Sequence, residues 1–371
     1  MPTTRRAAST AAVEAAAAAA VVGRSVMHPP SLSAAATAAH KAAKAAGPAY
    51  PLRTFLQLPA WARDNEFVTS GYRFEFNLTQ TLRSVFKLHN ETLNIWTHLG
   101  GFLVFVFLTF WVAACVVEPD SVAELPAAWA AWARDALPKG TAMRAREVVA
   151  RWPIFVYCAG AMCCLGASTV CHTLGAMPRH ISQAIWRFDY AAISIMITTS
   201  CFPPVFYTFL CLPHWRLFYL CACTVTGAAQ IILALDPRFM APAWRTTRAG
   251  TYLAQGTLAV VPLFHQLLGV WSGSGTPLPL QDFTAWQSAS CVSYVAAAFV
   301  FASRVPERWL PGKFDLWLHS HVIFHLLVLS GALLHFRASM MLLRWRDHHQ
   351  CEVDTYLWEN GSKDGLAGIM F

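Results

Sequence analysis

Residues 94–117 read NIWTHLGGFLVFVFLTFWVAACVV and contain no lysine, arginine, aspartate or glutamate. A helix needs about 20 apolar residues to cross a hydrocarbon core of about 30 Å thickness. Such a helix also satisfies its backbone hydrogen bonds internally, which lipid requires of any spanning segment. The stretch therefore predicts a membrane-spanning helix.

Six further apolar blocks follow the first. They cover residues 153–173, 188–209, 217–235, 250–270, 288–301 and 321–342, of which 288–301 is the shortest. Tryptophans cluster at or near the block ends, as they do at membrane interfaces: Trp96, Trp111, Trp152, Trp186, Trp215, Trp271, Trp317 and Trp345. Only 13% of the residues are charged, against about 25% in soluble domains. We therefore expect an all-α membrane protein, a seven-transmembrane helix bundle.

The charges of the short loops predict the orientation of the bundle. The third and fifth loops hold Arg216 as their one basic residue, whereas the even-numbered loops are basic throughout: Arg179, Arg187, Arg238, Arg245, Arg248, Arg304, Arg308 and Lys313. Basic loops stay in the cytoplasm. The N-terminus is thus predicted to be cytoplasmic and the C-terminus outside. On this orientation Asn360 can be glycosylated, whereas Asn77 and Asn90 cannot.

Composition divides the chain into four segments. We expect a disordered Ala-rich tail (1–50), a cytoplasmic segment with a juxtamembrane amphipathic helix (51–92), the seven-helix transmembrane domain (93–343) and an extracytoplasmic tail (344–371). The Ala-rich composition forms no core, and an acid-poor, Arg-containing stretch is also typical of organelle transit peptides. The plasma membrane and the endomembranes are both compatible locations.

The juxtamembrane helix is predicted from spacing. Apolar residues from Leu78 to Phe86 recur on one helix face together with His89, while Arg83 and Lys87 occupy another face. Two interpretations fit this pattern. The helix either lies in the membrane interface or is solvated and packs on the protein.

Ionisable groups inside spans are costly and mark functional sites. With the N-terminus inside, five such polar groups from the second, third and seventh spans meet at the cytoplasmic level: Ser168, His172, Asp189, His321 and His325. His321 and His325 are four residues apart, which places both rings on one helix face. Three histidines with an open fourth position form a common catalytic zinc shell. We therefore predict zinc on His172, His321 and His325.

The other groups near this level receive weaker assignments. Asp189 is expected to hydrogen-bond a water at the metal or to orient a ligand histidine. His335 lies about 15 Å beyond His325 along its helix, and His265 falls in the outer half of its span. We interpret both as hydrogen-bonded core residues. His98 has no partner at ligand spacing and is interpreted as structural.

Two other classes of site are excluded. The formal net charge is +8, but the basic residues are scattered and form no patch interleaved with aromatic residues, which argues against nucleic-acid binding. No Cys-x-x-Cys pair occurs, which argues against redox chemistry at cysteines and against zinc sites made of cysteines. Eight cysteines stand inside apolar blocks, where free cysteine packs well, and we expect packing roles for most of them: Cys158, Cys163, Cys164, Cys171, Cys201, Cys221, Cys223 and Cys291.

Several ordered motifs resemble the progestin and adipoQ receptor family over about residues 55–340. They are SVFKLHNETLNIWTH (84–98), STVCH (168–172), FDY (188–190), RVPER (304–308), PGKFD (311–315) and SHVIFH (320–325). The run from His89 to Gly101 is most similar to the plant-type heptahelical branch. The resemblance implies zinc on the three matched histidines, with Ser168 and Asp189 completing the site. The family is also similar to hemolysin III proteins and, more distantly, to alkaline ceramidases.

Two functions follow from the resemblance. In the first, a receptor signals through zinc-dependent hydrolysis of a lipid amide such as ceramide, with Asp189 relaying a proton and Ser168 donating to the oxyanion. In the second, the zinc pins the helices together and has no enzymatic role. The expected partners are membrane lipids, an extracellular hormone or sterol-like ligand, and further copies of the chain in a homo-oligomer. Transport is less favoured, since the buried charge lies at one depth.

Overall fold

The computed structural model describes residues 51–115, 149–271, 280–349 and 351. Within them the chain is helical, with short turns η1 (Phe55–Gln57), η2 (Ala60–Ala62), η4 (Pro237–Met240) and η5 (Pro242–Trp244). The α-helices are α3 (Leu78–Ser84), α4 (Thr92–Cys115), α6 (Trp152–Leu174), α7 (Arg179–Ser200), α8 (Phe202–Thr208), α9 (Pro213–Leu235), α10 (Arg245–Trp271), α11 (Leu280–Ser303) and α12 (Ser320–His348). The tail 1–50, most of the first loop and Asn360 lie outside the described residues.

The long helices have the character of membrane spans. Six segments are long and apolar enough to cross a bilayer, and α7 and α8 together make one of them. The remaining long helix, α10, has 27 residues and contains Pro262. Large apolar side chains such as Phe107, Ile232 and Phe299 are exposed along these helices, as lipid-facing residues are. The chain is an all-α, multi-pass membrane bundle.

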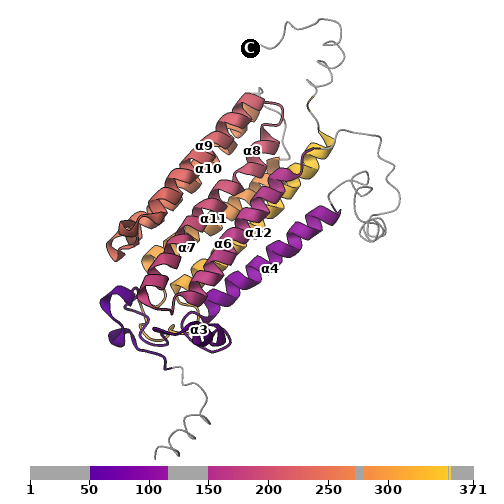
Figure 1. The fold of residues 1–371 in the computed structure, drawn as a ribbon. Helices are drawn as coiled ribbons and strands as arrows, with labels where there is room; N and C mark the ends of the chain where they lie inside the picture. Colours follow the sequence, from indigo (N-terminus) through magenta and orange to yellow (C-terminus); the bar gives the residue numbers. More distant parts are fainter. Residues whose placement is uncertain (1–50, 116–148, 272–279, 350, 352–371) are drawn as a thin grey trace, which may run out of the picture. The chain divides into compact units, whose positions relative to one another are not determined.

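The spans pack in a closed circuit. Each is in contact with the next along the chain, from α4 through α6, α7, α9, α10 and α11 to α12, and α12 returns to α4 (Figure 1). Small residues allow close approaches inside this circuit. A Cβ added at Gly160 would lie 1.8 Å from the Thr199 hydroxyl. The closure matters for function because it places the first span beside the last.

The helix boundaries differ most from the predicted spans in three places. The third span begins earlier, at Arg179, and is divided into α7 and α8 near Pro203 and Pro204, because proline lacks an N–H for the helix ladder. The predicted span 288–301 is too short, since α11 begins at Leu280. Its first turn holds Asp282, which interrupted the apolar run without ending the helix. The last helix continues past residue 343 to His348.

The juxtamembrane helix is shorter than predicted. Helix α3 ends at Ser84, so the predicted stretch to residue 89 is wrong in its second half. Its N-terminus is a capping box between Asn77 and Gln80. Leu78 and Leu82 are exposed, so the apolar face points away from the protein. This arrangement favours the interfacial interpretation over packing on the protein.

The segment before α4 (residues 51–91), which is predicted to be cytoplasmic, docks on the loop between α11 and α12. The Asp315 carboxylate accepts hydrogen bonds from the Thr69 hydroxyl at 2.8 Å and the Ser70 hydroxyl at 2.6 Å. The Glu307 carboxylate, fully buried, accepts from the Asn65 amide at 3.0 Å and from the Ser320 backbone N–H at 2.6 Å. These bonds fasten the segment to the residues that begin α12.

A disulfide joins Cys211, in the turn after α8, to Cys351, just beyond α12. Sequence reasoning assigned no role to either residue. The bond lies at the end of the bundle that is predicted to be outside, where disulfides persist, and it supports the predicted orientation. Of the cysteines expected to pack in the core, Cys163 and Cys221 are instead exposed, because apolar spans also present cysteine to lipid.

Candidate metal centre

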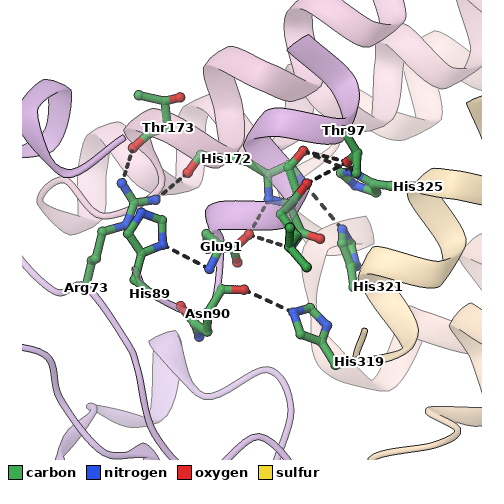
Figure 2. Close-up of polar contacts among 12 residues, drawn as sticks. Arg73, His89, Asn90, Glu91, Thr97, His172, Thr173, His319, His321 and His325 are labelled. Atoms are coloured by element: carbon green, nitrogen blue, oxygen red, sulfur yellow. Dashed lines mark hydrogen bonds and ion pairs between the residues drawn. The ribbon is translucent and has the colours of Figure 1, made fainter. Parts of the chain in front are cut away.

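Three histidines, of which His172 and His325 are buried, converge between α6 and α12. His172 lies in the last turn of α6, and His321 and His325 occupy the first turns of α12, with candidate ligand atoms all within 4.8 Å of one another. The Nε2 atoms of His172 and His321 are 3.3 Å apart (Figure 2). Two nitrogens bound at 2.0–2.1 Å to one tetrahedral zinc ion lie about 3.3 Å apart. The donor set and its spacing therefore fit zinc.

The orientation of His172 is set by Glu91, a residue that sequence reasoning missed. The Glu91 carboxylate lies 2.6 Å from Nδ1 of His172, and the Asn94 amide donates to the same carboxylate oxygen at 2.6 Å. An Nδ1–H that donates to a carboxylate leaves Nε2 free for a metal. The orienting role predicted for Asp189 is therefore filled by Glu91 at this histidine. An acid one residue before a span was the available signal.

His325 is oriented by the same helix. Its Nδ1 lies 3.2 Å from the Asn94 carbonyl and 3.4 Å from the Thr97 hydroxyl, so the ring donates into α4. His98 stacks on His325 with ring centroids 3.6 Å apart. The structural role of His98 stays a prediction, since both of its buried ring nitrogens lack a hydrogen-bond partner among the described residues. Helix α4 thus buttresses ligand histidines from two other helices.

The cytoplasmic segment supports the end of α6. The Arg73 guanidinium donates to the His172 carbonyl at 2.6 Å and to the Thr173 carbonyl at 3.3 Å (Figure 2). Its burial lowers the pKa of Arg73 to about 10. Nearby, His89 Nδ1 accepts from the Glu91 backbone N–H at 3.0 Å. Burial, and next the charge of Arg73, lower the pKa of His89 to about 3, so this ring is neutral.

Asp189 and Ser168 lie together beside the cluster. Asp189 is buried on α7 and Ser168 is buried on α6. Both side chains line the same cavity as His321 and His325. The five residues that the alternating direction of the spans predicted at one membrane level therefore lie close together.

Two cavities meet at the histidines. One, of about 280 Å³, has a mostly apolar lining that includes Ile193, Leu253 and Val328. The other, of about 620 Å³, is lined by His172 and by polar residues of the cytoplasmic segment and loops. We call the first the apolar cavity and the second the vestibule. His321 lines both, so the cluster stands at their junction.

The histidines read as core residues lie elsewhere. His335 is buried, with Nδ1 3.0 Å from the Gln287 side-chain carbonyl and Nε2 2.9 Å from the Ser200 carbonyl. His265 pairs with the Tyr219 hydroxyl at 2.9 Å. Both are satisfied by protein groups, in agreement with the prediction.

Comparison with known proteins identifies the relatives of the chain. The haemolysin-III related family model matches residues 86–336. Heptahelical transmembrane protein 4 of Arabidopsis thaliana is 34% identical over 81% of this chain and 91% of its own length. Heptahelical transmembrane protein 1 of the same plant is 38% identical over 81% and 83%. The adiponectin receptor protein of Drosophila melanogaster is 30% identical over 81% of this chain and 61% of its own length.

Proposed function

The chain belongs to the haemolysin-III related family of heptahelical membrane proteins, and we propose that it is a receptor of the adiponectin-receptor type that binds zinc through His172, His321 and His325 and hydrolyses a lipid amide. One observation carries the proposal. Three imidazoles converge at the junction between a polar vestibule and an apolar cavity. An amphiphilic substrate needs both environments around its reacting bond.

Zinc is the metal that the donors favour. Imidazole nitrogens suit zinc better than magnesium or calcium, which prefer oxygen ligands. Three protein ligands leave a fourth position open, as in catalytic rather than structural zinc sites. Zinc bound there would supply a Lewis acid that makes water nucleophilic near neutral pH and polarises an amide carbonyl.

Asp189 and Ser168 would handle the proton and the oxyanion. The Ser168 hydroxyl has one hydrogen, which the Asp189 carboxylate holds in the resting site. When Asp189 takes a proton from the attacking water, its new O–H can donate to Ser168 Oγ. The Ser168 hydrogen is then free to turn toward the oxyanion. Asp189 finally returns its proton to the leaving amide nitrogen.

The cavities assign the two ends of the substrate. An acyl chain would occupy the apolar cavity, whose wall includes Phe324 and Val328. The polar end of the lipid would occupy the vestibule. A hormone or sterol-like ligand from outside would act on the opposite end of the bundle and shift the site through the helices.

Metal analysis and a hydrolysis assay test the proposal together. Purified protein should contain about one zinc per chain, and the His321→Ala/His325→Ala double variant should contain none. Free fatty acid should be released from an acyl amide lipid by the wild type. Asp189→Asn should keep the zinc and lose the release. A folded, zinc-loaded wild type that turns over no acyl amide would contradict the enzymatic part of the proposal.

A structural zinc is the alternative. It is favoured by the ligands' origin, since one ion on His172 and His321 would fasten α6 to α12. In that case His172→Ala lowers the melting temperature strongly, whereas Asp189→Asn changes no activity. Measuring the melting temperature and the activity of both variants under the same conditions distinguishes a structural zinc from a catalytic one.

A further inference from the structure

The vestibule is strongly basic. Its lining contains the arginines Arg63, Arg73, Arg187, Arg245 and Arg248, against the two carboxylates of Asp64 and Glu91. Both carboxylates are already engaged. Asp64 lies 3.1 Å from Arg245, and Glu91 lies 2.6 Å from His172.

Among the described residues, Arg245 is the one arginine of these five that has a carboxylate partner. Arg248 is 3% exposed, and its guanidinium donates to the Phe239 and Ala241 carbonyls while its Nε is unpaired. Arg187 makes one 3.4 Å bond, to the Leu235 carbonyl. A buried cation without a counterion is unfavourable, so the site is electrostatically incomplete.

The position of Arg248 indicates which kind of ligand would supply the missing negative charge. Arg248 lines both the vestibule and the apolar cavity. An anion that contacts it therefore stands where the vestibule meets the apolar cavity, and His321 lines both cavities as well. Guanidinium groups bind phosphate through paired hydrogen bonds, and they do so best where water is excluded.

We propose that the vestibule binds the anionic, phosphate-type headgroup of a membrane lipid whose acyl chain occupies the apolar cavity. The inference rests on the proposed function for the location of the chain. It adds the charge of the substrate, which the histidine cluster does not specify. Free phosphate shares this chemistry but leaves the apolar cavity empty.

A binding experiment tests the charge preference. Zinc-loaded Asp189→Asn protein, which cannot turn the lipid over on the proposed mechanism, is placed in neutral-lipid nanodiscs. Binding of ceramide is compared with binding of ceramide 1-phosphate carrying the same acyl chain. We expect the phosphorylated lipid to bind at least about tenfold more tightly, a difference of about 1.4 kcal/mol. The preference should shrink at high salt.

A matched pair of variants locates the effect. Arg187→Gln should remove most of the preference. Arg216→Gln is the control, because Arg216 is also half-buried and makes one comparable bond, 3.3 Å to the Leu210 carbonyl, at the other end of the bundle. Equal binding of the two lipids, or a preference unchanged by Arg187→Gln, would overturn the inference. So would inorganic phosphate that binds as tightly as ceramide 1-phosphate.

The anionic site and the enzymatic activity can be tested separately. A wild type that binds the phosphorylated lipid through Arg187 and releases no fatty acid keeps the anionic site and loses the enzyme. A wild type that hydrolyses both lipids and binds them equally keeps the enzyme and loses the anionic site.

Discussion

The carboxylate of Glu91 lies 2.6 Å from Nδ1 of His172, although the two residues are 81 positions apart in the chain. Glu91 stands just before α4, and His172 stands near the end of α6. A residue outside the spans therefore fixes the tautomer of a candidate metal ligand within them.

Glu91→Gln should weaken zinc binding by about 10- to 100-fold, the usual consequence of losing a carboxylate behind a ligand histidine. Competition with a chromogenic chelator measures this affinity. Glu66→Gln, which neutralises an exposed carboxylate of the same cytoplasmic segment, should leave the affinity unchanged. Equal affinities for wild type and Glu91→Gln would contradict the orienting role.

Glu307→Ala should destabilise the protein by roughly 3 kcal/mol, because it leaves the buried Ser320 and the half-buried Asn65 without their acceptor. The beginning of α12 carries His321, so zinc affinity should fall as well. Thermal unfolding in detergent measures the first effect. Asn65→Ala removes one bond and should cost less than half as much. A Glu307→Ala protein as stable as the wild type would show that this carboxylate is dispensable.

His89→Asn should make the protein less sensitive to acid. His89 has a pKa of about 3 in the folded chain, below the ordinary value of about 6.5 that it regains on unfolding. The unfolded state thus binds an additional proton between these values, and stability falls as the pH drops below about 6.5. For one proton the limit is about 1.4 kcal/mol per pH unit.

The measurement is the melting temperature between pH 7 and pH 5. The slope should be smaller for His89→Asn than for wild type. His180→Asn serves as the control because this ring is exposed. Parallel slopes for wild type and His89→Asn would argue against a buried neutral ring.

Cys211→Ser and Cys351→Ser should each destabilise the protein by about 2–4 kcal/mol. The two residues form one bond, so the double variant should be no less stable than either single variant. Thiol labelling under denaturing, non-reducing conditions counts the free cysteines. Additive losses in the double variant would mean that the residues act separately.

Orientation can be measured by glycosylation. Asn360 should accept a glycan in microsomes, and Asn360→Gln should abolish the mass shift. Asn77 should remain unmodified, since it belongs to the predicted cytoplasmic segment. A glycan on Asn77 would show that the bundle has the opposite orientation.

The sequence predicts different parts of this molecule unequally. The length and the alternating direction of the spans were sufficient to predict that His172, His321 and Asp189 lie at one membrane level. The depth of a residue in the membrane follows from its place in its span and from the number of spans before it. Glu91 was missed because it lies outside a span, where carboxylates are unremarkable. The vestibule could not be predicted, since it joins Arg248 of α10 to Arg73 of an irregular segment whose path no periodicity describes.

The closure of the circuit, in which α12 returns to α4, also sets an order of events during biosynthesis. Glu91 and Asn94 are translated first, yet the ligands they support arrive with α6 and finally with α12. A nascent chain arrested before α12 holds one of the three histidines. On the proposed function, zinc loading would therefore be a late step that is complete only once α12 has been inserted.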